Sequence, residues 1–115
     1  MHSTPDVKGY MYRGNEAHFE NRTGWAASGD IEIELVQPLS GESSFRDFVG
    51  RHGQGIHHIE FKVENIDKTT RLMNKAGFMT LMSGKGERGY FAYYETVEPL
   101  KIIWKAVQQC KLLSD

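Results

Sequence analysis

The sequence Gly-Ile-His-His-Ile-Glu-Phe-Lys-Val at residues 55–63 has the alternating character of a β-strand buried on one side. Successive side chains of a strand point to opposite faces, so the alternation predicts a strand over 56–63 with two different faces. The even-numbered positions form a polar face of Ile56, His58, Glu60 and Lys62. The odd-numbered positions form a helix-facing side of His57, Ile59, Phe61 and Val63. We therefore expect His58 on the polar face and His57 in a structural role.

The residues after this strand predict one helix and three more strands. Asn65 can cap a helix whose apolar positions recur at helical spacing as far as Ala76, and Gly77 stands where a left-handed C-terminal residue belongs. Strands are expected over 78–82, 89–94 and 100–107, with a turn at 84–86 and a loop over 95–99. Residues 55–107 therefore form a βαβββ module, followed by a polar tail over 108–115.

The residues before this strand predict a smaller antiparallel unit. Over 7–37 we expect a meander of three strands, the last of which runs from Ile31 and is ended by Pro38. Residues 40–54 form a connecting helix and loop, with Ser43 or Ser44 as the cap. This order of elements in a chain of 115 residues predicts a single α+β domain.

Charge and composition exclude several classes of partner. The 14 basic and 15 acidic residues give a net charge of -1 without a basic stripe, so no nucleic acid or membrane partner is expected. Cys110 is the single cysteine and can form no internal disulfide. No apolar run is long enough for a transmembrane helix and the N-terminus has no signal-peptide pattern, so we expect a cytoplasmic protein.

Four segments in this order resemble the vicinal oxygen chelate superfamily, which includes glyoxalases, bleomycin resistance proteins and methylmalonyl-CoA epimerases. The segments are residues 31–39, 53–63, 89–95 and 98–106. The resemblance implies a glyoxalase-like fold in which two βαβββ modules pair and their curved sheets form a cup. It also implies one divalent metal in that cup (Zn, Co, Ni or Mn), acting as a Lewis acid on a substrate with two nearby oxygens.

The resemblance implies four metal ligands, and this sequence matches two of them. Glu34 matches the ligand on the last strand of the first module, and His58 matches the ligand on the first strand of the second module. The first strand and helix of module one, which would carry another His, have no counterpart. Lys105 stands where the last strand of module two should carry a Glu, and a lysine offers no acceptor to a metal. His18, in an expected strand of the first half, could substitute for the missing His, which we do not favour.

The side chain of Lys105 can have either of two roles, and Phe91 and Tyr93 are candidates for lining a ligand pocket. Lys105 either neutralises Glu34 in a salt bridge, which we favour, or binds an anionic ligand or acts as a catalytic base beside Glu34. Phe91 and Tyr93 share one face of their strand and could line an apolar ligand pocket, while Tyr90 and Tyr94 share the other face.

Three functions stay open at this point. The favoured one is a cup that binds a small molecule, has an incomplete metal site and is formed in a homodimer. The second is a metal-dependent lyase, isomerase or epimerase of a small thioester or hemithioacetal, with Glu34 and Lys105 as catalytic residues and Glu34 and His58 as metal ligands. The third is a truncated member of the superfamily that has only a structural or interaction role. The homodimer is expected because the incomplete first module leaves bare sheet edges, which two chains can cover by edge pairing or by exchanging strands.

Overall fold

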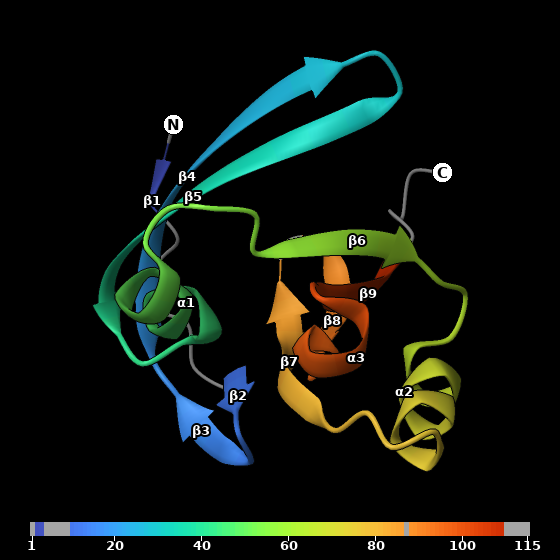
Figure 1. Ribbon diagram of the computed structural model, residues 1–115. Coiled ribbons are helices and arrows are strands. Elements are labelled where there is room, and N and C mark those ends of the chain that lie inside the picture. Colours follow the sequence, from blue (N-terminus) through green and yellow to red (C-terminus); the bar gives the residue numbers. More distant parts are fainter. Residues whose placement is uncertain (1, 4–9, 87, 110–115) are drawn as a thin grey trace.

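The computed structural model describes residues 2–3, 10–86 and 88–109, which form two curved β-sheets and three helices (Figure 1). A three-stranded sheet has the order β1-β4-β5, and a six-stranded sheet has the order β3-β2-β7-β8-β9-β6. The strands are β1 (His2–Ser3), β2 (Tyr10–Tyr12), β3 (Asn15–Ala17), β4 (Phe19–Ser28), β5 (Ile31–Gly41), β6 (His58–Lys62), β7 (Thr80–Gly86), β8 (Gly89–Tyr94) and β9 (Ile103–Gln109). The helices are α1 (Ser44–His52), α2 (Ile66–Lys75) and α3 (Val97–Leu100).

The expected βαβββ module is present as β6, α2, β7, β8 and β9. β6 pairs in parallel with β9, and β9, β8 and β7 pair antiparallel in turn. The side chain of Asn65 accepts a hydrogen bond of 2.9 Å from the backbone N–H of Lys68, which confirms the cap, and Gly77 has the positive φ of 99° expected after the helix. The sequence therefore predicts this module correctly in type and order.

The N-terminal half differs from the expected three-stranded meander. β2 pairs with β3 and with β7, so it extends the six-stranded sheet, whereas β4 and β5 form a long hairpin in the other sheet. Residues 7–9, where the predicted meander begins, lie outside the described residues. Tyr10 and Tyr12 of β2 are buried in the same core cluster as Met82 of β7, and this long-range packing places β2.

Pro38 does not end its strand, because β5 continues to Gly41. β5 is an edge strand among the described residues, and the register of the hairpin shifts between Glu20 and Asn21, opposite Pro38 to Ser40. Proline lacks the N–H that a central strand needs, but an edge position or a β-bulge tolerates it.

The C-terminal elements are also displaced from their predicted bounds. β7 includes the expected turn at 84–86. The short helix α3 covers the end of the expected loop and the first residue of the expected last strand, and β9 begins at Ile103 and extends into the expected tail. Lys101 ends α3 in the left-handed region, with φ 65°. The rest of the expected tail, residues 110–115, lies outside the described residues.

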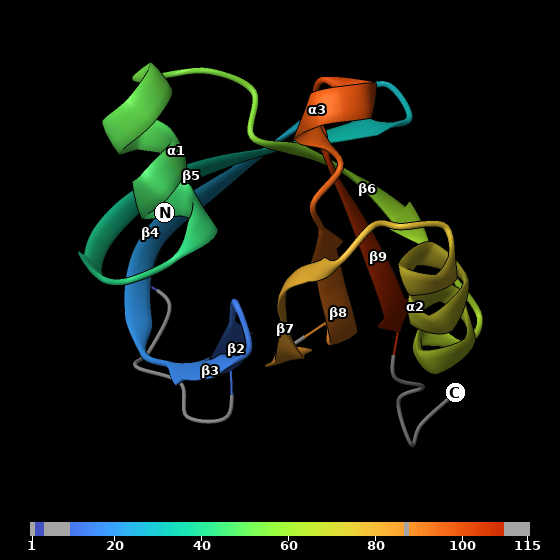
Figure 2. The ribbon, with the colours of Figure 1, turned by 60° about the horizontal axis from the view of Figure 1, so that its bottom comes forward.

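The two sheets face each other (Figure 2), and side chains of both line a cavity that forms a cup. α2 covers the outer face of the six-stranded sheet, where Ala92, Tyr94 and Ala106 form a small core. A larger core lies between the sheets and includes Phe45 from α1. Its buried members are Tyr10, Tyr12, Ala17, Phe19, Phe45, Leu81, Met82, Tyr93 and Ile103. No helix in the described part of the chain has the length and apolar character needed to cross a membrane.

Candidate functional site: a cup between the two sheets

A cavity of about 660 Å³ lies between the β4–β5 hairpin and the strands β7, β8 and β9. The wall on the hairpin consists of Phe19, Asn21, Thr23, Trp25, Glu32, Glu34 and Val36. The opposite wall includes Arg88, Phe91, Tyr93, Lys105 and Val107. The volume lies within the range of roughly 300–1,000 Å³ that is usual for small-molecule sites.

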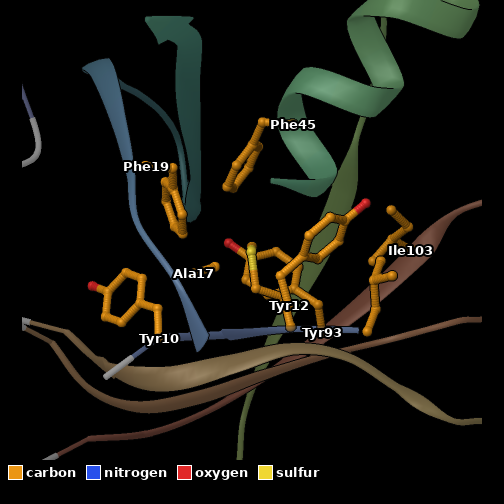
Figure 3. Close-up of a cluster of buried hydrophobic side chains, with 9 residues drawn as sticks. Tyr10, Tyr12, Ala17, Phe19, Phe45, Tyr93 and Ile103 are labelled. Carbon is orange, nitrogen blue, oxygen red and sulfur yellow. The ribbon is translucent and has the colours of Figure 1, made fainter. Parts of the chain in front are cut away.

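A group of aromatic rings, here called the aromatic end, lines part of the cavity, and Figure 3 shows Tyr10, Phe19, Phe45 and Tyr93 among them. The ring of Tyr10 lies 5.2 Å from that of Phe19 and 5.1 Å from that of Phe91, and Phe45 lies 5.7 Å from Tyr93. Separations of this size, with tilted or edge-on planes, are the favoured packing of aromatic side chains. The aromatic end is therefore a packed aromatic surface built by β2, β4, α1 and β8.

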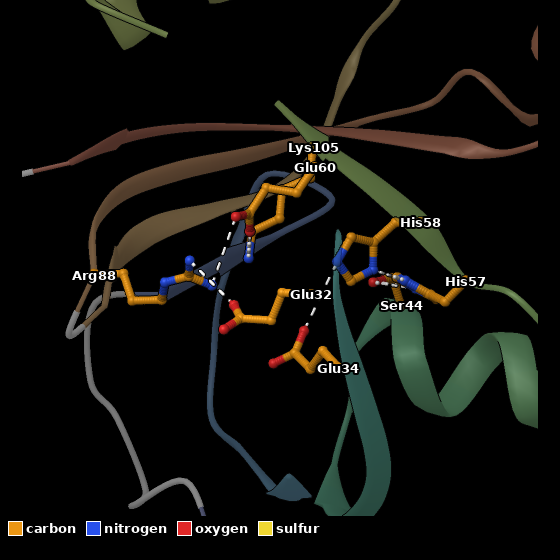
Figure 4. A network of polar contacts seen from close by, with 8 residues as sticks. All are labelled: Glu32, Glu34, Ser44, His57, His58, Glu60, Arg88 and Lys105. Atoms are coloured by element: carbon orange, nitrogen blue, oxygen red, sulfur yellow. Dashed lines mark hydrogen bonds and ion pairs between the residues drawn. The ribbon is translucent and has the colours of Figure 1, made fainter. Parts of the chain in front are cut away.

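His58 and Glu34 face each other from the two sheets (Figure 4). Nε2 of His58 on β6 lies 3.8 Å from Oε1 of Glu34 on β5, and their side chains are only 10% and 21% exposed. Burial is the main cause that raises the pKa of Glu34. The structure thus brings together the two predicted metal ligands, although 24 positions separate them in the sequence.

His57 lies beside His58 and packs against α1, rather than on the side of the six-stranded sheet that α2 covers. Its ring stacks on Phe45 at 4.4 Å, its Nδ1 lies 2.8 Å from Nδ1 of His58, and its Nε2 lies 3.1 Å from the hydroxyl of Ser44. β6 begins at His58, so residue 57 precedes the strand and the strict alternation of faces does not apply to it.

Both histidines are neutral at neutral pH. Burial lowers the pKa of His57 to about 4 and that of His58 to about 3, and the positive charge of Lys105 acts in the same direction on both. Two neutral imidazoles can share the short Nδ1–Nδ1 contact because one donates and the other accepts. Neither ring brings a positive charge to Glu34.

Lys105 pairs with Glu60 rather than with Glu34, which corrects the favoured expectation. Its Nζ lies 2.9 Å from Oε1 of Glu60. The two residues are direct neighbours in the parallel β6–β9 pairing, so the backbone register brings their side chains together. Glu60 also contacts Arg88 at 3.6 Å, and Arg88 contacts Glu32 of the hairpin at 3.5 Å (Figure 4). Ion pairs thus join the two walls of the cup.

Comparison with known proteins assigns the family. A family model described as the Glyoxalase/Bleomycin resistance protein/Dioxygenase superfamily matches residues 8–94. The chain belongs to this superfamily. The fold is shared with the hypothetical protein BH1468 from Bacillus halodurans C-125, with a TM-score of 0.62 and 23% identity over 87% of this chain and 70% of that protein.

A second relative matches over a short stretch only. The uncharacterized protein YqjC of Bacillus subtilis (strain 168) is 41% identical over 34 residues, which are 30% of this chain. The matched stretch spans about a quarter of that protein, 24% of its length. It supports common ancestry of the stretch and assigns no activity to the whole.

The side chains in the cup do not fit the tightly held divalent metal of the superfamily resemblance. Glu34 and His58 are two suitable donors, but no group of three or more His, Cys, Asp or Glu in the described part of the chain could hold a metal ion. Burial has the largest effect on the pKa of each donor, and the positive charge of Lys105 has the second largest and lowers both pKa values. The ammonium group of Lys105 therefore lies near both donors. A divalent cation there would be repelled by this charge.

The predicted site residues are largely brought together. Glu34, Lys105, Phe91 and Tyr93 all line the cup, and His58 meets Glu34 at its edge. Tyr94 points the other way and shares a hydrogen bond of 2.8 Å with Thr70 of α2, as the strand alternation predicts. The catalytic, metal-binding and ligand-binding roles of these residues remain predictions.

His18 does not join Glu34 and His58. Its side chain is 47% exposed and lies 3.7 Å from Glu16. Together with Tyr12, Arg13 and Glu42 it lines a separate depression of the surface. The structure therefore gives no support to its use as a substitute ligand.

Asn21 is a cup residue that the sequence analysis did not single out. It lies on β4, lines the cavity and is 5% exposed. An asparagine in a strand of mixed composition carries no signal of its own. The alternation with Phe19 and Thr23 indicates a shared face, but only the opposite sheet shows that this face is enclosed.

Proposed function

We propose that this protein is a small-molecule-binding member of the superfamily whose cup takes a ligand with an apolar, aromatic body and works without a resident metal. The observation that carries this proposal is the cavity of about 660 Å³, which is lined by aromatic rings and has Lys105 at the position where the superfamily resemblance implies a metal-binding Glu. Apolar surface with a few fixed polar groups is the usual composition of a ligand pocket.

Lys105 supports a binding role by the way in which it is held. Its Nζ lies 5.0 Å from the centroid of Tyr93 and 5.5 Å from that of Phe91, in addition to its ion pair with Glu60. Ring faces attract a cation electrostatically, so these contacts fix the ammonium against the wall of the cup. The apolar rings beside it stay available for a ligand.

We also propose that the cup is formed in a homodimer that pairs through β5. Ile31, Ile33 and Leu35 lie on the outer face of this strand and are 69%, 46% and 55% exposed. β5 is also the edge of its sheet among the described residues, and the hairpin projects from the rest of the molecule (Figure 1). A second copy related by twofold symmetry can cover both the unpaired edge and the apolar row.

The binding function is tested with two adjacent residues of β8 that point to opposite faces. Phe91 lines the cup, whereas Tyr90 is 43% exposed and does not line it. We expect naphthalene to quench the fluorescence of Trp25 in the cup wall with saturation, and Phe91→Ala to weaken binding about tenfold or more, since a buried aromatic contact is worth more than 1.4 kcal/mol. Tyr90→Ala is the matched control and should bind like the wild type.

Two results would contradict the proposal. One is the absence of saturable binding by the folded wild type. The other is stoichiometric Zn, Co, Ni or Mn in protein purified without a polyhistidine tag and lost in His58→Ala, which would instead favour the metal-dependent lyase or isomerase. The donor pair of Glu34 and His58 at 3.8 Å is the observation that keeps this second function worth testing.

A further inference from the structure

Glu34 carries a carboxylate in the wall of the cup that accepts no hydrogen bond from a described residue. Its side chain is 21% exposed and lines the cavity, so a ligand in the cup can reach it. The polar group that it faces is Nε2 of His58 at 3.8 Å, a separation longer than a hydrogen bond. His58 is neutral and offers no opposite charge either. Largely buried carboxylates are normally paired or hydrogen-bonded, so Glu34 is free to take a partner from a ligand.

Two cations in the wall of the cup are held by carboxylates other than Glu34 (Figure 4). Lys105 pairs with Glu60 at 2.9 Å, because the two residues are direct neighbours in the parallel pairing of β6 with β9. Arg88 contacts Glu60 at 3.6 Å and Glu32 at 3.5 Å. No ion pair with a described lysine or arginine therefore neutralises Glu34.

The charge of Lys105 acts on Glu34 without direct contact. Burial raises the pKa of Glu34, and the ammonium of Lys105 opposes this shift because it favours the ionised form. An ionised carboxylate accepts shorter and stronger hydrogen bonds than a neutral oxygen does. The same ammonium opposes the binding of another cation beside it. A neutral O–H or N–H group is therefore the donor that suits Glu34.

Aromatic rings adjoin Glu34 in the wall of the cup. The ring of His58, which faces Glu34, lies 5.0 Å from the ring of Tyr93. Burial raises the pKa of Tyr93 and the charge of Glu34 adds to this effect, so the carboxylate lies close to this ring. Trp25 is paired with Glu34 across the hairpin, and all three residues other than His58 line the cavity. A ligand ring that packs on the aromatic end can thus carry a donor within reach of Glu34.

We infer that Glu34 binds the ligand of the cup directly, by accepting a hydrogen bond from a neutral O–H or N–H group on an aromatic body. This inference rests on the proposed binding function and adds to it the chemistry of the ligand. Phenols and aromatic amides belong to this class. An aromatic molecule of the same size without a donor fills the same space and leaves the carboxylate without a partner.

The test compares 2-naphthol with 2-methoxynaphthalene, which has an oxygen at the same position and no donor. We expect the wild type to bind 2-naphthol roughly tenfold more tightly in isothermal titration calorimetry, because a hydrogen bond to a charged group contributes about one such factor or more. In Glu34→Met, which keeps about the length of the side chain and removes the carboxylate, this ratio should fall to about one. Naphthalene is titrated into each protein to measure binding of the ring system alone.

Glu32→Met is the matched control. Glu32 lies on the same strand and lines the same cavity, but it is already paired with Arg88. The preference for 2-naphthol should therefore persist in this variant. Glu34→Gln provides a second measurement if Glu34→Met does not fold. Its neutral oxygen accepts a weaker hydrogen bond, so the preference should be smaller than in the wild type.

The outcomes separate this inference from the proposed function. Binding of none of the three probes by the wild type would overturn the binding function and this inference together. Equal binding of 2-naphthol and 2-methoxynaphthalene by the wild type, or an unchanged preference in the Glu34 variants, would overturn the role of Glu34 alone. Loss of the preference in Glu32→Met as well would also count against Glu34, since it would assign the effect to the overall charge of the hairpin. A preference lost in Glu34→Met alone, with unchanged binding of naphthalene, supports the inference.

Discussion

Two neighbouring histidines at the edge of the cup link its structure to pH. Burial holds the pKa of His57 at about 4 and that of His58 at about 3, below the ordinary value of 6.5. The unfolded chain therefore takes up protons as the pH falls through 6.5, whereas the folded protein does not until the pH reaches about 4. Stability is thus fully present above the ordinary pKa and is lost as the pH falls below it.

We predict that lowering the pH from about 7 to about 5 reduces the free energy of unfolding by roughly 2 kcal/mol for each of these histidines. Glu34 partly offsets the loss at the acid end, since burial raises its pKa and the folded protein then binds a proton more readily. Denaturant titrations at the two pH values should show a smaller loss for His58→Gln than for the wild type. Replacing the exposed His52 by Gln is the control and should leave the loss unchanged. Equal losses in all three proteins would contradict the neutral, buried state of His58.

At the scale of elements, Thr96 fixes the junction between β8, α3 and β9. The residue is 0% exposed. Its hydroxyl donates to the carbonyl of Ile102 at 2.6 Å and accepts from the N–H of Trp104 at 2.9 Å. These bonds satisfy backbone groups just before and within β9 and so position the strand that carries Lys105.

We predict that Thr96→Val lowers the free energy of unfolding by about 2 kcal/mol or more, because it keeps the shape of the side chain and leaves two backbone groups without their partner. Thr96→Ser is the matched variant. It keeps the hydroxyl and removes one methyl group, which is worth roughly 1 kcal/mol. Chemical denaturation measures both. A serine variant that is less stable than the valine variant would show that packing, rather than the hydroxyl, holds this junction.

At the scale of the whole molecule, the cup depends on how two sheets are held apart. The hairpin contacts the six-stranded sheet through the aromatic end, through His58 and through the ion pair of Arg88 with Glu32. Its outer face carries the apolar row of Ile31, Ile33 and Leu35. A second copy that covers this outer face would stabilise the hairpin, and so would stabilise the wall of the cup that carries Asn21 and Glu34.

We predict that the wild type sediments as a dimer at micromolar concentration and that Ile33→Lys sediments as a monomer, because a charge in the middle of a paired β5 edge is costly to bury. Leu72→Lys is the control. Leu72 lies on α2 and is 59% exposed, so its replacement changes hydrophobicity by the same amount on a different surface. A monomeric wild type would contradict the dimer and would leave the binding function to a single chain.

The sequence alone determined the features that depend on neighbouring residues. The alternation over 56–63, the Asn65 cap and Gly77 defined the βαβββ module, because strand and helix periodicity and the capping of helix ends act over a few positions. The resemblance to the superfamily selected Glu34, His58 and Lys105, and strand alternation selected Phe91 and Tyr93. All five residues lie at the cup.

Only the tertiary structure decided how these elements combine. It placed β2 in the six-stranded sheet, paired Lys105 with Glu60, packed His57 against α1 and enclosed Asn21. Each of these outcomes depends on contacts between distant segments or on the register of two strands, and neither leaves a pattern in the local sequence. The sequence thus fixes the fold of the module and points to its site, whereas the packing of one sheet against the other determines which groups the site offers to a ligand.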